Sequence, residues 1–200
     1  YFTVILYVDE NYLGEKSFLK SDKLTFNQIL ATFEGIVYDK SVDGTYAMVV
    51  AYNGIATRIR IADTYQGLPV TTIYDSAFKD NKTITTVIIP DSVTSIGESA
   101  FSSCEILTDI NLDDDVLSLG RNAFSSCKEL ASIKLPIGLR TIPYGLFSGC
   151  NKLTSVTLPR SFESIDGSAF ASTAIENMVL PTTVTNIGNN AFTSSKLKSI

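Results

Sequence analysis

The chain has 200 residues, of which 44% are hydrophobic, a composition that suffices for one elongated core. Its net charge is −5 and it has no Lys/Arg cluster, which argues against a nucleic-acid partner because such partners require a basic surface. The sequence contains no histidine, which excludes His-activated nucleophiles and imidazole metal sites. It also lacks a phosphate-binding glycine loop and a nucleotide-binding motif, and we expect no cofactor. Because histidine is missing, we also expect no catalytic activity. No apolar run approaches the length of a membrane helix, and we expect no direct membrane insertion.

Residues 1–40 contain no repeat. An apolar, β-rich run covers 1–7, a turn follows at 9–11, and residues 12–19 are suited to a return strand. Residues 24–33 predict a short helix with its apolar side chains on one side, namely Leu24, Ile29, Leu30 and Phe33. Strand, strand and helix in this order resemble the start of a β-grasp module. We therefore predict a small β-rich N-terminal module over residues 1–40.

Residues 44–62 are typical of two strands separated by the turn signal Asn53-Gly54. We predict that they pair as a hairpin, which caps a second region covering residues 41–200. The run Arg58-Ile59-Arg60-Ile61 is then the first strand of that region's sheet.

One phrase recurs through the remainder of the chain and ends each time in a phenylalanine. These residues are Phe78, Phe101, Phe124, Phe147, Phe170 and Phe192, so the step is 23 residues four times and then 22. A fixed period in this range indicates a structural unit stacked on copies of itself, as in a solenoid. No single copy can bury its apolar face alone, and stacking creates one continuous core.

Each unit combines a short strand with a second apolar pair. Ile133 and Leu135 alternate with polar residues, which is the period of a half-buried strand. Pro136 ends this strand because proline has no amide hydrogen to continue a ladder. Leu139 and Ile142 then form an apolar pair on the far side of the coil. Periodicity alone leaves open a leucine-rich-repeat horseshoe and a parallel β-helix.

The residues of the repeat also resemble a known family. The segment Ile96-Gly97-Glu98-Ser99-Ala100-Phe101, followed by Cys104, Leu107, Ile110 and Leu112, is similar to the BspA-type leucine-rich repeat, and the resemblance extends over roughly residues 44–200. It implies a right-handed leucine-rich-repeat solenoid with a parallel β-sheet on the concave face and short strands and turns on the convex side. Family members are mostly secreted or attached to the bacterial surface, so the resemblance implies an extracellular or cell-surface location and a role in adhesion or protein binding.

Several copies depart from this pattern. Asp113 stands where other copies have the strand-ending proline. The glycine that follows the second apolar pair is replaced by Tyr74, Pro143 and Asp166. The chain ends at Ile200 within the strand of a new coil, which predicts a fragment of a longer protein.

Three cysteines occupy one offset of the repeat. Cys104, Cys127 and Cys150 share this offset with Asn81 of the preceding copy. The family resemblance implies that these side chains form a structural ladder by bonding the backbone of the turn. The alternatives are a disulfide, a metal site or a nucleophile, and the common offset favours the structural ladder. The run Asp113-Asp114-Asp115 could bind Ca²⁺, but a solvated corner is the more common role of such a run, and we predict no metal site.

The outward residues of the strands are candidates for partner binding. From the columns that these residues form we select Arg58, Arg60, Ile88, Asp109, Asn111 and Lys134. Their mixed charge favours a protein or glycan partner over a polyanion. The leading hypothesis is a non-catalytic binding or adhesion module. The alternative functions are an accessory array of a larger secreted enzyme and a structural spacer. For the site, the alternative is that binding lies in the N-terminal module or in repeats outside this chain.

Overall fold

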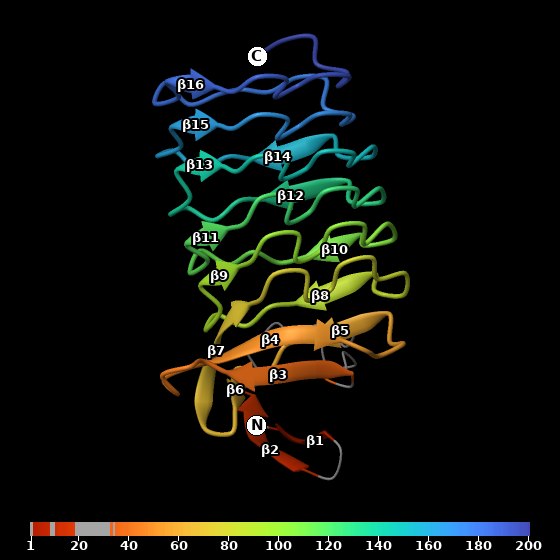
Figure 1. The fold of residues 1–200 in the computed structure, drawn as a ribbon, viewed down its shortest axis with the longest axis vertical. Helices are drawn as coiled ribbons and strands as arrows, with labels where there is room; N and C mark the ends of the chain where they lie inside the picture. Colours follow the sequence, from red (N-terminus) through yellow and green to blue (C-terminus); the bar gives the residue numbers. More distant parts are fainter. Residues whose placement is uncertain (1, 9–10, 19–32, 34) are drawn as a thin grey trace.

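A computed structural model describes residues 2–8, 11–18, 33 and 35–200, which form a stack of coils with short strands (Figure 1). The strands run across the long axis of the stack, and successive coils follow one another along it. The described residues form no helix, so none of them provides a long apolar helix able to cross a membrane. The helix predicted at 24–33 lies almost wholly outside the described residues.

Two columns of strands line two sides of the stack. The first strand column contains β5 (Arg58–Arg60), β8 (Thr86–Ile88), β10 (Asp109–Ile110), β12 (Ser132–Lys134) and β14 (Ser155–Thr157). The second strand column contains β4 (Ala47–Tyr52), β7 (Leu68–Ile73), β9 (Ser95–Ile96), β11 (Ser118–Leu119), β13 (Thr141–Ile142), β15 (Ser164–Ile165) and β16 (Asn186–Ile187). Where neighbours within a column pair, they do so in parallel and mostly one repeat apart, as Ile133 does with Val156. The parallel bridge between Asn177 and Ser199 continues the first column.

A third side of the stack consists of turns rather than strands. The amide of each core phenylalanine donates to a carbonyl of the next coil, as in the 2.8 Å bond from Phe101 N to Ala123 O. Each turn contains two residues with positive φ, for example Ser99 (56°) and Ser103 (59°). Small polar residues and glycine fit these positions because bulky side chains clash in the left-handed region. We call this continuous set of bonds the turn ladder.

The phenylalanines fill the interior beneath the turn ladder. Phe78 to Phe170 are at most 1% exposed. Successive rings stack with centroid separations between 4.8 and 5.9 Å and interplanar angles of 18° or less. The repeat predicted from the spacing of these residues is therefore the unit of the core.

The hairpin predicted at 44–62 is wrong. β4 pairs in antiparallel register with β3 (Ile36–Lys40) and in parallel with β7, whereas β5 belongs to the first column and pairs with β8. Residues 53–54 instead pack against the backbone of Gly35, whose lack of a side chain permits the approach, because a Cβ on Gly35 would lie 2.3 Å from Gly54 Cα. The amide of Asn53 also donates to Gly35 O at 2.8 Å. The prediction that Arg58 begins the first column is confirmed.

The start of the chain contains the strand pair expected there. β1 (Phe2–Val8) and β2 (Asn11–Phe18) pair in antiparallel register with an irregularity between Leu6 and Tyr7. The strand β3 lies within the residues assigned to the N-terminal module, yet it pairs with β4 of the array. A further short strand, β6 (Thr64–Tyr65), folds back on β7.

Candidate interaction surface

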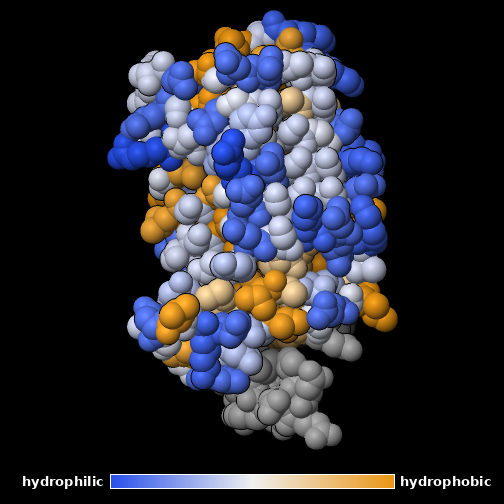
Figure 2. Space-filling model, in the orientation of Figure 1, coloured by the Kyte–Doolittle hydropathy of each residue, from blue (hydrophilic) through white to orange (hydrophobic). Residues whose placement is uncertain are grey.

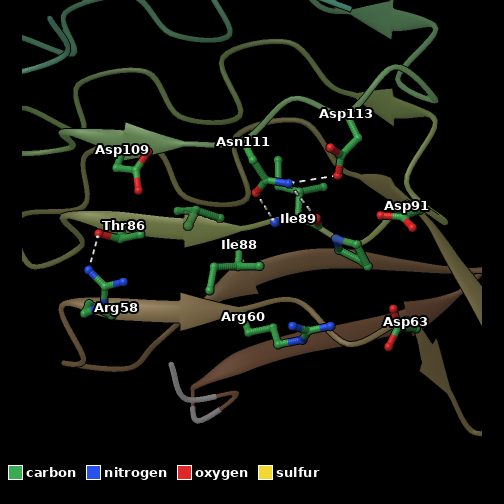
Figure 3. A pocket seen from close by; sticks show the side chains of 12 residues that line it. Arg58, Arg60, Asp63, Thr86, Ile88, Ile89, Asp91, Asp109, Asn111 and Asp113 are labelled. Atoms are coloured by element: carbon green, nitrogen blue, oxygen red, sulfur yellow. Dashed lines mark hydrogen bonds between the residues drawn. The ribbon is translucent and has the colours of Figure 1, made fainter. Parts of the chain in front are cut away.

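A depression of about 400 Å³ lies on the outer face of the first strand column (Figure 3). Five of the six predicted binding residues line it, namely Arg58, Arg60, Ile88, Asp109 and Asn111. They come from three successive coils, since β5, β8 and β10 are adjacent in this column. The remaining lining residues are Asp63, Thr86, Val87, Ile89, Pro90, Asp91 and Asp113. We call this set the mixed-charge pocket.

The alternation of side chains along β8 determines which of its residues face the pocket. In β8, Val87 is 1% exposed and points into the core, so its neighbours Thr86 and Ile88 point outward. Arg58 Nη1 donates to Thr86 Oγ1 at 3.1 Å, which fixes the guanidinium over the neighbouring strand. Ile88 lies among the charged side chains of the pocket in Figure 3, next to Arg60, and forms an apolar centre.

Asn111 has a structural role as well as a place in the pocket. Its Oδ1 accepts from Ile89 N at 2.8 Å, and its Nδ2 donates to Ile89 O at 3.0 Å. The side-chain amide thus satisfies backbone groups of the neighbouring coil, in the manner of a strand residue. The same Nδ2 donates to Asp113 Oδ2 at 2.9 Å, which holds that carboxylate at the pocket edge.

Sequence reasoning did not assign the acidic end of the pocket to partner binding, although it considered Asp113 as a possible Ca²⁺ ligand. Asp63, Asp91 and Asp113 each lie three residues beyond the end of a first-column strand, a spacing that could have revealed them. Burial, together with the negative charge of Asp91, raises the pKa of Asp113. In Figure 3 the Arg60 side chain extends toward Asp63, so charges of both signs face the same space. Within the described part of the chain, no three acidic or cysteine side chains are arranged to hold a metal ion.

Lys134 does not join the other predicted residues. It lies on β12, which does not pair with β10, and its ammonium contacts Asp114 Oδ1 at 3.1 Å. The Lys134 side chain is 59% exposed. Its charge is therefore displayed separately from the mixed-charge pocket.

The structure places the cysteine offset in the core. Cys104, Cys127 and Cys150 are reduced and fully buried. Each thiol donates to the carbonyl of the phenylalanine in the preceding coil, as from Cys104 Sγ to Phe78 O at 3.0 Å. Asn81 acts differently, because its Oδ1 accepts from the amides of Thr83 and Ile84 within its own coil. Burial raises the pKa of Cys104 and of Cys150 to about 12, so these thiols are poor nucleophiles.

The recurring turn, the buried phenylalanine column and the cysteine offset match a known repeat. The family model described as the BspA-type leucine-rich repeat region matches residues 71–198 in six copies. The chain belongs to this family. The alternative of an unrelated parallel β-helix is therefore excluded, and the leucine-rich-repeat solenoid is confirmed. No curated protein sequence matches the chain.

Solved structures of bacterial proteins are similar to the chain in fold. A leucine-rich cell-surface protein from Faecalibacterium prausnitzii shares 30% identity with a TM-score of 0.61, over 82% of this chain and 54% of its own. A leucine-rich repeat protein from T. pallidum shares 28% identity with a TM-score of 0.66, over 78% of this chain and 79% of its own. The pneumococcal vaccine antigen PcpA shares 26% identity with a TM-score of 0.62, over 80% of this chain and 46% of its own. The chain thus spans about half of the first and third proteins.

Proposed function

We propose that this BspA-type array is a non-catalytic binding module of a bacterial cell-surface or secreted protein, and that its partner occupies the mixed-charge pocket. The family and the surface location named for the F. prausnitzii protein support the general assignment. The proposal rests mainly on one observation about the pocket. Five outward residues from three coils converge on one depression, together with three further aspartates.

The chemistry of the pocket favours a protein segment as its partner. Two arginines and four aspartates surround the apolar side chain of Ile88. A complementary surface carries charges of both signs around a small apolar side chain, an arrangement typical of protein–protein recognition. A polyanion would be repelled by the excess of carboxylates. No aromatic side chain lines the pocket to stack on a sugar ring.

The available side chains give no support to catalysis. The sequence has no histidine, and all three thiols are buried with raised pKa values. Asp113 is held by Asn111 next to Asp91, but no activated nucleophile stands beside this acidic pair among the described residues. The pocket is therefore better suited to binding than to bond cleavage.

The proposal is tested by binding of extracellular host proteins and glycans to the chain and to pocket variants. Arg60→Gln and Asp109→Asn each remove one charge from the pocket rim, and Asp109→Asn also preserves the size of the side chain. We expect each to weaken binding of a protein ligand by about tenfold or more, since buried charge pairs at interfaces contribute several kcal/mol. Lys152→Ala serves as the matched control, because Lys152 is 60% exposed and pairs with Glu129 outside the pocket.

The outcomes separate the proposal from its alternatives. Loss of binding in both pocket variants but not in Lys152→Ala supports the pocket as the binding surface. Binding that survives both substitutions and maps to residues 1–40 would reduce the repeats to a spacer. Selective capture of a glycan would overturn the assignment of a protein partner.

A further inference from the structure

The stack contains one level at which both strand columns are interrupted. β10 does not pair with β12, and β11 does not pair with β13. Elsewhere within residues 35–200, at least one of the two columns is paired between neighbouring coils. We call this level the seam. It separates a first block, residues 35–126, from a second block, residues 128–200.

The interruption of the second column has a cause in the sequence. In the paired coils, the residue after the second-column strand donates its amide to the preceding coil, as Gly120 N does to Ile96 O at 2.8 Å. At the seam this residue is Pro143, which has no N–H to donate to Leu119 O. Asp166 occupies the same offset one coil later and still donates to Ile142 O at 2.9 Å. The missing N–H, rather than the presence of a side chain, is therefore the decisive difference.

The surface is open along the seam. A cavity of about 330 Å³ lies between the segments 117–119 and 138–143. Leu117 and Ile137 beside it are 65% and 60% exposed. Figure 2 shows hydrophobic surface at the left edge of the molecule, at about the level of β11 in Figure 1. The contacts that cross this level outside the turn ladder include the exposed ion pair Lys134–Asp114, which contributes little to stability. Two single hydrogen bonds also cross it, from Ile137 N to Asp114 Oδ1 at 3.2 Å and from Glu129 N to Glu105 O at 3.1 Å.

The turn ladder remains intact across the same level. Asn122, Phe124 and Ser126 donate their amides to carbonyls of the next coil at 2.9, 3.1 and 2.7 Å. The rings of Phe124 and Phe147 stack at 5.9 Å, and Cys150 Sγ donates to Phe124 O at 3.1 Å. The blocks are thus joined firmly along one side and weakly along the other two.

We propose that the seam is a hinge, which opens on the strand side while the turn ladder stays closed. Opening there requires no strand hydrogen bonds to break, whereas opening between other coils requires their loss. Segments with few backbone hydrogen bonds open at the lowest free energy. The mixed-charge pocket lies wholly in the first block and Lys134 in the second, so flexing at the seam changes the distance between them. This inference does not depend on the proposed function.

Native-state hydrogen exchange measures this opening directly. The amides of Leu119 and of residues 140–141 face the seam and are expected to exchange at least about tenfold faster than those of β9 and β15. The amide of Ser118, which donates to Thr94 O within the first block, and those of Asn122, Phe124 and Ser126 should remain slow. Pro143→Gly restores the N–H that the other coils use and is expected to slow exchange at 119 and 140–141 by about tenfold. Pro159→Gly is the control, because it has the same effect on the unfolded chain and lies away from the seam.

Three results decide the matter. If the wild-type amides at 119 and 140–141 exchanged as slowly as those of β9 and β15, the hinge would be overturned. Equal effects of Pro143→Gly and Pro159→Gly on the amides at 119 and 140–141 would also overturn it. Faster exchange of the turn-ladder amides than of the strand amides would place the opening on the opposite side. Circular dichroism spectra of both variants must match the wild type, which verifies that the coils are folded.

Discussion

Truncation of one ring in the phenylalanine column should be costly. Phe101 is fully buried and stacks between Phe78 at 4.8 Å and Phe124 at 5.5 Å, with interplanar angles of 5° and 7°. Burial of such a side chain contributes about 1.5–3 kcal/mol. The cavity left by Phe101→Ala and the loss of two ring contacts add to this value. We expect a total loss of about 3–5 kcal/mol in the free energy of unfolding.

Two other positions provide matched comparisons. Phe192 occupies the same offset but is only partly buried, and it stacks on Phe170 at 5.3 Å. Phe192→Ala should therefore cost about 1–2 kcal/mol. Lys134→Ala removes an exposed side chain and should change stability by less than about 0.5 kcal/mol. Urea unfolding followed by circular dichroism measures all three values. An unchanged m-value shows that the substitution changes stability and not the surface exposed on unfolding.

The ordering of these losses is the critical result. If Phe101→Ala cost no more free energy of unfolding than Phe192→Ala, burial of the ring in the phenylalanine column would not be what stabilises the array. If Lys134→Ala cost as much as Phe101→Ala, the assignment of inward and outward residues would be wrong.

Two further predictions concern titratable groups. The native thiols should resist alkylation at pH 8, because burial raises the pKa of all three cysteines, and unfolding without reductant should expose three thiols; a count of one would contradict their reduced state. Burial and the charge of Asp91 raise the pKa of Asp113 in the folded protein. The stability that the protonated Asp113 contributes is therefore present in acid, and it is lost as the pH rises from about 3.8, the ordinary pKa, through the raised pKa. Asp113→Asn should therefore raise the melting temperature at pH 7 but not at pH 3, and an equal effect at both pH values would argue against this titration.

The repeat made most of the fold predictable from the sequence. The spacing of the phenylalanines identified the coil, and the alternation around Ile133 identified the first strand column, because both follow from burial on one face. The cap was not predictable from local signals. Asn53-Gly54 has the composition of a tight turn, but the contact of Gly54 with Gly35 is distant in sequence and outweighs that preference.

The candidate site was predictable only in part. Outward residues such as Arg60 follow from strand alternation. Asp63 and Asp91 share one offset beyond their strands, but alternation does not give the direction of side chains in the connections. The sequence groups Lys134 with Arg60 and Asn111 because all three occupy the same position of the repeat. The loss of pairing between β10 and β12 separates it from them, and that loss depends on contacts between coils.

The orientation of the strands has a mechanical consequence. They run across the long axis of the stack, so the hydrogen bonds between coils lie along that axis (Figure 1). Tension applied along the axis loads these bonds one coil at a time, and we expect the array to peel in steps rather than to rupture at once. Each released coil of about 23 residues lengthens the chain from about 5 Å of stack to about 75–80 Å of extended polypeptide. Such an array would behave as an extensible tether that absorbs work under flow.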